Sequence, residues 1–99
     1  MDRVAWLEST LRSAFAPEHL DVVDDSARHA GHAGAGSGGH FRVVIVSGHF
    51  RKQDLLARQR AVYAALGAGM QSEVHALSLR TLTPEEWAEA RRGKTTEDR

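Results

Sequence analysis

The spacing of apolar residues at the start of the chain predicts a helix. These residues recur every three or four positions, as one face of an α-helix requires: Val4, Leu7, Leu11, Ala14 and Phe15. Asp2 belongs to the residue types that cap helix N-termini, and Pro17 cannot continue a helix. We therefore expect one helix between these two positions.

Three later stretches are expected to be strands. Residues 20–23 are short and β-prone, and Asp and Ser residues that favour a turn follow them. Residues 41–47 are rich in β-branched side chains and apolar at most positions, which predicts a central strand. Residues 74–82 alternate, and this alternation places four side chains on one face: His75, Leu77, Leu79 and Thr81.

Two further helices are indicated around the third strand. The first has an apolar stripe, with Arg58 and Arg60 off the stripe and Gly67 as its end: Leu55, Leu56, Gln59, Val62, Tyr63 and Leu66. The second begins at Thr83, which forms a capping box with Glu86, has proline at its first position and includes Trp87. The order helix, strand, strand, helix, strand, helix predicts an α/β (α+β) fold with a three-stranded sheet covered by helices.

Two segments lack the pattern of a regular element. Residues 27–39 are rich in glycine and are expected to form a long mobile loop, a place where functional residues are common. Residues 91–99 are polar, without an apolar anchor, and are expected to be a disordered tail. The domain is therefore expected to span residues 1–90.

Composition narrows the function classes. The 99 residues include 13 basic and 13 acidic side chains, so no overall positive field attracts nucleic acid or anionic lipid. No apolar run is long enough to cross a bilayer, and the first residues do not form a signal peptide, so we expect a cytoplasmic protein. Asp24 and Asp25 are neighbouring turn residues, and no serine lies in a nucleophile motif, so we expect no enzymatic activity.

The absence of cysteine limits any metal chemistry. The chain contains six histidines and no thiol, so it cannot build a thiolate site alone. Taken by itself, His75 is expected to be a structural histidine of a strand. His29 and His32 would then be solvated loop residues.

Three motifs in order resemble the BolA family. They are His40–Ser47 with the following Phe50, Leu56–Tyr63, and Val74–Trp87. The resemblance extends from about Val4 to Trp87. It departs from the family pattern at three places: Gln59 replaces a common histidine, Gly38-Gly39 precedes His40-Phe41, and Lys52 replaces a common glycine.

This resemblance implies a function without catalysis. The family has a class II KH-like fold and associates with monothiol glutaredoxins, with which it shares a [2Fe–2S] cluster and glutathione. The third-strand histidine of the family, His75 here, is one ligand. The loop ligand matches His29, and His32 is its local competitor. Such a cluster needs four ligands, two of which can be histidines. The free protein is then expected to hold no cofactor and to be a monomer or a weak homodimer.

The family resemblance also implies an alternative, a DNA-binding transcriptional regulator of stress response and morphology. Four residues near the second helix form a basic cluster that would meet phosphates or glutathione carboxylates, or else be a solvated face: Arg51, Lys52, Arg58 and Arg60. The Gly-x-x-Gly matches lie between strands, whereas KH domains place this loop between helices. A third reading is an adaptor that binds proteins and does not depend on its histidines.

Overall fold

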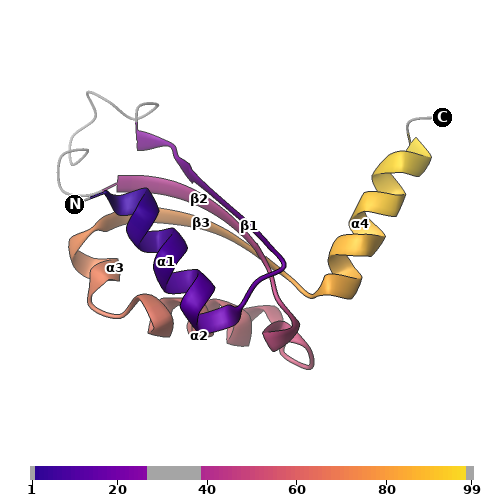
Figure 1. Ribbon diagram of the computed structural model, residues 1–99, viewed down its shortest axis with the longest axis horizontal. Coiled ribbons are helices and arrows are strands. Elements are labelled where there is room, and N and C mark those ends of the chain that lie inside the picture. The colour runs from indigo at the N-terminus through magenta and orange to yellow at the C-terminus, as the bar shows by residue number, and fades with distance from the viewer. Residues whose placement is uncertain (1, 27–38, 98–99) are drawn as a thin grey trace.

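The computed structural model describes residues 2–26 and 39–97. Figure 1 shows their arrangement. In chain order the elements are α1 (Arg3–Phe15), β1 (His19–Asp24), β2 (Gly39–Val46), the 3-10 turn η3 (Gly48–Phe50), α2 (Leu55–Leu66), the short α3 (Gly69–Ser72), β3 (Val74–Leu82) and α4 (Pro84–Glu97). The predicted order of helices and strands is confirmed, with η3 and α3 as short additions on either side of α2.

The three strands form one sheet in the order β1-β2-β3. β1 pairs with β2 in antiparallel fashion, and β2 pairs with β3 in parallel fashion. A parallel pair needs a long crossover, and α2 provides it. β2 is therefore the central strand, as predicted, and β1 and β3 are the two edges.

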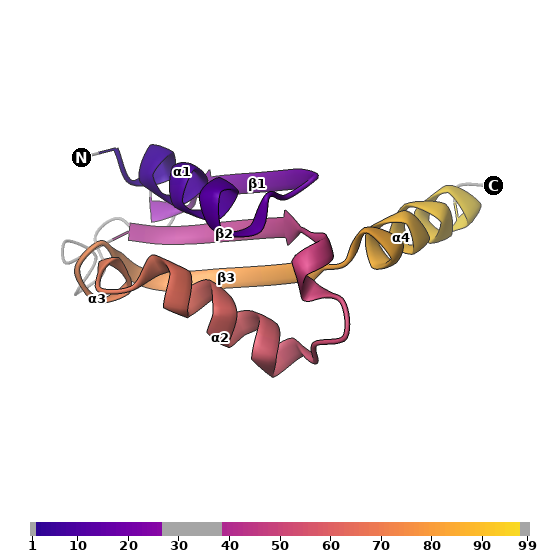
Figure 2. The same ribbon diagram turned by 60° about the horizontal axis from the view of Figure 1, so that its bottom comes forward.

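The helices cover one face of this sheet. Figure 2 shows α1 and α2 on the same side, with α1 towards β1 and α2 towards β3, while α4 extends away from the end of the strands. The opposite face of the sheet carries no helix in the described part of the chain. The expected covering of the sheet by helices is thus found on one face.

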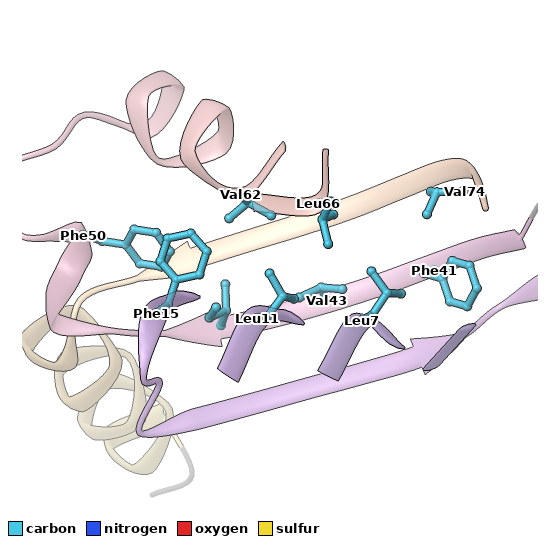
Figure 3. Close-up of a cluster of buried hydrophobic side chains, with 10 residues drawn as sticks. Leu7, Leu11, Phe15, Phe41, Val43, Phe50, Val62, Leu66 and Val74 are labelled. Atoms are coloured by element: carbon cyan, nitrogen blue, oxygen red, sulfur yellow. The ribbon is translucent and has the colours of Figure 1, made fainter. Parts of the chain in front are cut away.

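The core lies between the sheet and these two helices. Leu7 and Leu11 from α1 and Val62 from α2 are fully buried there. Figure 3 shows them meeting the side chains that β2, η3 and β3 direct toward the helices. Phe41 and Phe50 are buried in the same core. This packing fixes the strands whose ends carry the candidate site.

The ends of α1 follow the predicted signals. The Asp2 side chain accepts a hydrogen bond from the backbone N–H of Ala5 at 3.1 Å. The helix ends at Ala16, which adopts a left-handed conformation with φ 44° just before Pro17. The residue types at Asp2 and Pro17 therefore predicted correctly where α1 begins and ends.

The stripe predicted for α2 is confirmed at Val62 and Leu66 and is wrong at Leu55 and Leu56. The buried side chains are Arg58, Val62 and Leu66, spaced every four residues. Leu55 and Leu56, both placed on the stripe, are 64% and 56% exposed. Arg58 therefore lies on the buried face rather than off it, because its guanidinium finds hydrogen-bond acceptors there.

The structure describes parts of the two segments, residues 27–39 and 91–99, for which no regular element was predicted. Gly39 is the first residue of β2, so it belongs to the sheet and not to the predicted loop. Residues 27–38 lie outside the described residues. α4 continues to Glu97, so the described part of the predicted tail is helical. None of the helices in the described ranges has the length and apolar character needed to span a membrane.

Candidate functional site

A β-bulge places His75 at a special position between β2 and β3. Gly39 pairs with Val74 and the next residue, His40, pairs with Ala76, so His75 is the extra residue of β3. The predicted alternation is confirmed from Leu77 onward, since Ser78 and Arg80 are exposed and Leu77 and Leu79 pack against the core. The predicted face of the His75 side chain stays a prediction.

Backbone hydrogen bonds fix the chain on both sides of residues 27–38 beside this bulge. The N–H of His40 donates to the Ser26 hydroxyl at 3.0 Å, and the N–H of Asp25 donates to the His40 carbonyl at 2.7 Å. The N–H of Gly39 donates to the carbonyl of Glu73 at 3.2 Å. The segment that carries His29 and His32 thus leaves and enters the sheet next to the start of β3.

Chain length limits how far the loop histidines lie from this anchor. His29 is three positions along the chain from Ser26, which corresponds to at most about 11 Å of extended chain. His32 is six positions from Ser26, or at most about 22 Å. Both histidines lie outside the described residues. Their candidate role stays a prediction, and so does that of His75.

A small cavity of about 210 Å³ adjoins the bulge. It is lined by Asp25, His40, Phe41, Arg42, Ala76 and Ser78. The Arg42 Nε lies 3.5 Å from an Asp25 carboxylate oxygen, so a cation and an anion are already paired here. Hydrogen bonds from the Ser26 side chain and backbone lower the pKa of the neighbouring Asp24 carboxyl, which keeps this turn charged.

The donor set of this chain fits only part of a [2Fe–2S] site. Within residues 2–26 and 39–97, no three histidine or acidic side chains converge in a way that could hold a metal ion. The chain has no cysteine. Imidazole can replace thiolate at two of the four positions of such a cluster. The residues present therefore fit the histidine share of a site whose sulfur ligands come from another molecule.

The predicted basic cluster does not form one free surface. The Arg51 guanidinium makes two hydrogen bonds to the Glu85 carboxylate, at 3.0 and 2.7 Å. This pairing lowers the pKa of Glu85 and raises that of Arg51. Lys52 and Arg60 are exposed. A role of these basic residues in binding stays a prediction, but Arg51 is already paired with the Glu85 carboxylate.

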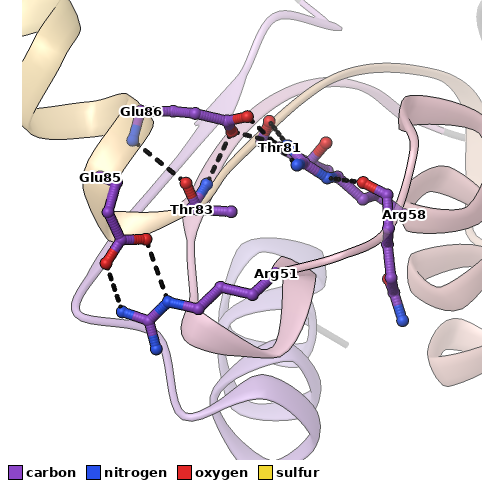
Figure 4. A network of polar contacts seen from close by, with 7 residues as sticks. Arg51, Arg58, Thr81, Thr83, Glu85 and Glu86 are labelled. Carbon is purple, nitrogen blue, oxygen red and sulfur yellow. Dashed lines mark hydrogen bonds and ion pairs between the residues drawn. The ribbon is translucent and has the colours of Figure 1, made fainter.

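Arg58 is the centre of a polar network shown in Figure 4. Its side chain, only 8% exposed, donates to both carboxylate oxygens of Glu86, at 2.7 and 3.1 Å. It also donates to the backbone carbonyls of Gln53 at 2.9 Å and Thr81 at 3.4 Å. Arg58 thus joins α2, β3 and α4, which is a structural role.

The Glu86 carboxylate binds Arg58 and also caps the start of α4. Its carboxylate accepts from the backbone N–H of Thr83 at 2.9 Å, and its own N–H donates to the Thr83 hydroxyl at 3.1 Å. The predicted capping box is confirmed. The Arg58 hydrogen bonds, followed by that of the Thr83 backbone, lower the pKa of Glu86. Sequence reasoning missed this partner of Arg58, although the capping box had already placed a carboxylate at the start of α4.

A second contact holds α4 against the sheet. The His19 ring stacks on Trp87 with centroids 4.6 Å apart, and its Nε2 lies 3.1 Å from an Asp21 carboxylate oxygen. Trp87 is half-buried. His19 therefore has a structural contact that the sequence did not indicate.

A larger groove of about 570 Å³ lies where α2, β3 and α4 meet. It is lined by Leu55, Arg58, Gln59, Leu79, Arg80, Thr81, Leu82, Glu86, Glu89 and Ala90. Most of its charges are already paired, since Arg58 bonds Glu86 and Arg92 bonds Glu89. Its apolar lining includes the exposed Leu55.

Comparison with known proteins gives a consistent result. A family model described as BolA-like protein matches residues 11–86. The DNA-binding transcriptional regulator BolA of Escherichia coli K12 is 46% identical over 81 residues, covering 82% of this chain and 75% of that protein. BolA-like protein 1 of the mouse is 39% identical over 85 residues, covering 86% of this chain. The aligned part spans 61% of the mouse protein.

Solved structures show the same similarity. The BolA domain of SufE1 from Arabidopsis thaliana superposes with a TM-score of 0.77 at 36% identity, covering 87% of this chain and 96% of that domain. Yeast Fra2 superposes with a TM-score of 0.60 at 31% identity, covering 86% of this chain and 83% of that one. Sequence and fold therefore agree across most of the chain.

Proposed function

The chain belongs to the BolA-like family, and from this premise we propose that it binds a monothiol glutaredoxin and supplies histidine ligands to a [2Fe–2S] cluster shared with it. The observation that supports the proposal is the position of Ser26 and Gly39, the residues on either side of 27–38, beside the bulge. Residues 27–38, which contain His29 and His32, are anchored at both ends beside the start of the strand that carries His75.

His75 is expected to be the more important ligand of this chain. It lies between Val74 and Ala76, which both pair with β2, so its backbone is held on either side. The second ligand is expected from residues 27–38, where either His29 or His32 can serve. When bound, the cluster supplies electron transfer and iron chemistry, while this chain supplies imidazoles and sets their spacing. The thiolates come from glutaredoxin and glutathione.

The proposal is tested with cluster-loaded glutaredoxin, glutathione and four forms of this protein: wild type, His75→Ala, His29→Ala and His32→Ala. We expect wild type to change the visible circular dichroism of the cluster and to raise its reduction potential, because histidine ligation raises that potential. His75→Ala should abolish most of this change. Each loop variant should have a smaller effect, since the other loop histidine can substitute. Identical spectra for His75→Ala and wild type would contradict the proposal.

A second candidate function is binding to duplex DNA, which the name of the E. coli relative favours. The equal number of basic and acidic residues argues against strong non-specific affinity. Arg51 and Arg58 are also engaged with carboxylates of α4. A titration with duplex DNA at physiological salt distinguishes the two functions. Nanomolar, sequence-selective binding would favour the regulator, and weak binding that vanishes with added salt would favour the cluster partner.

A further inference from the structure

Glu73, two positions before His75, is held by three hydrogen bonds from three different elements. Its N–H donates to the Gly69 carbonyl of α3 at 2.8 Å, and its carbonyl accepts from the Gly39 N–H of β2 at 3.2 Å. Its carboxylate accepts from the Nε of Arg3, the first residue of α1, at 3.1 Å. The residue that leads into β3 is therefore tied to two helices and to the neighbouring strand.

Both glycines that bond Glu73 lie where a side chain would not fit. A Cβ at Gly69 would come within 2.2 Å of the Trp6 ring of α1, and a Cβ at Gly39 would come within 2.2 Å of the Phe41 ring. Real Cβ atoms do not approach other atoms so closely, so the backbone at each glycine lies directly against an aromatic ring. The two backbone groups that hold Glu73 are thus themselves held by close packing.

Arg3 also acts on the end of β1. Hydrogen bonds from Ser26 are the main cause of the lowered pKa of the Asp24 carboxyl, and the positive charge of Arg3 contributes to the same shift. Ser26 in turn accepts a hydrogen bond from the His40 N–H. Figure 1 shows the start of α1, the end of β1, α3 and the starts of β2 and β3 at the same end of the molecule. Arg3 therefore lies among the segments that surround the β-bulge.

The Arg3–Glu73 ion pair is suited to setting a position rather than to stabilising the fold. The Arg3 side chain is 41% exposed and that of Glu73 is 25% exposed. Ion pairs with this much exposure contribute little to stability. The ligands of a site must nevertheless be held to within about 0.5 Å of their working geometry, so a weak contact can decide where a ligand lies.

We propose that Glu73, held by Arg3, is the positioning residue of His75, because it fixes the backbone of the β-bulge that carries this histidine. This inference rests on the proposed function. The extra residue of a bulge has no partner of its own on the neighbouring strand. The place of His75 is therefore set by Ala76 on one side and by Val74, with Glu73 before it, on the other. Glu73 does not bind the cluster, and its effect passes through the backbone.

The first test measures hydrogen exchange in the free protein. Glu73→Met and Arg3→Met each keep a long side chain and remove one charge of the pair, and Arg3→Met leaves Glu73 itself unchanged. The amide of Gly39 should exchange about two- to fivefold faster in both variants, as expected for the loss of a partly exposed ion pair. The double variant should resemble either single variant, because all three lack the same interaction. Thermal melts should stay close to that of wild type.

Two further variants serve as controls. Arg3→Lys keeps a cation at this position and should restore most of the wild-type exchange rate. Glu89→Met breaks an exposed ion pair with Arg92 on α4, at the other end of the molecule, and should leave the exchange of Gly39 unchanged.

The second test adds cluster-loaded monothiol glutaredoxin and glutathione to the same variants. Glu73→Met and Arg3→Met should shift the visible circular dichroism and the reduction potential part of the way toward those of His75→Ala. Arg3→Lys and Glu89→Met should give wild-type values. An ion pair with a merely structural role would not move the potential of a cluster in a folded protein, whereas a displaced histidine ligand would.

The outcomes separate this inference from the proposed function. Wild-type spectra and potential for Glu73→Met and Arg3→Met would overturn the inference and leave the proposed function intact, provided that His75→Ala still differs from wild type. Unchanged exchange of the Gly39 amide in both variants would also overturn it, because the bulge would then not depend on the pair. Identical spectra for His75→Ala and wild type would remove the proposed function, and the positioning role of Glu73 with it.

Discussion

The guanidinium of Arg58 and the carboxylate of Glu86 form a two-point ion pair that joins α2 to the first turn of α4, with N–O distances of 2.7 and 3.1 Å. The same carboxylate completes the capping box of α4. One residue pair therefore fixes both the start of the last helix and its position against β3. This makes Arg58 a structural residue, although its charge suggested a binding role.

Replacing Arg58 should destabilise the fold. Arg58→Ala removes charged hydrogen bonds to Glu86 and leaves the Gln53 and Thr81 carbonyls without this donor, so we expect a loss of about 2 to 3 kcal/mol in the free energy of unfolding. Urea denaturation measures it. Arg60→Ala is the matched control, because Arg60 is exposed, and it should change stability by less than about 0.5 kcal/mol. Equal effects of the two variants would contradict the structural role of Arg58.

The stability of the protein should fall in acid partly through Glu86. Its pKa in the folded state lies below the ordinary value of 4.5, because Arg58 and the Thr83 backbone bond its charged form. A lowered carboxyl pKa contributes stability that is fully present above pH 4.5 and is lost as pH falls through the folded value. Glu86→Gln should therefore show a shallower decline in unfolding free energy than wild type below pH 4.5. Parallel declines in the two proteins would contradict this assignment.

Lys52 is held in a backbone conformation that suits glycine. Its φ is 65°, in the left-handed region, which costs a residue with a side chain about 1 kcal/mol. Lys52→Gly should therefore raise the free energy of unfolding by about 0.5 to 1 kcal/mol, as thermal melts can measure. Gln53→Gly, at a neighbour without positive φ, should instead lower it. A destabilised Lys52→Gly would show that the lysine side chain makes a compensating contact.

Local signals allowed much of the fold to be predicted. The bounds of β3 are those expected, and the capping box from Thr83 to Glu86 and the cap at Asp2 form as their residue types suggest. Each of these depends on residues a few positions apart. The glycine that the resemblance expected at Lys52 also has a reason in this structure, which is the positive φ at that position.

What the sequence could not predict depends on tertiary contacts. Apolar periodicity placed Val62 and Leu66 correctly, but it also placed Leu55 inside and Arg58 outside. The acceptors that bury Arg58 come from other elements, which the pattern of α2 does not show. The bulge at His75 arises from the register between β2 and β3, which no pattern within one strand reveals. α4 continues to Glu97, but its last residues carry no apolar stripe, so the sequence pattern did not predict a helix there.

Direct detection of histidine nitrogen at the cluster tests the central claim. This chain is labelled with ¹⁵N-histidine, mixed with unlabelled, cluster-loaded glutaredoxin and glutathione, reduced, and examined by pulsed electron paramagnetic resonance. The account predicts strongly coupled ¹⁵N from this chain in wild type and the loss of one such coupling in His75→Ala. Absence of strongly coupled ¹⁵N in wild type, or identical couplings in His75→Ala, would contradict it.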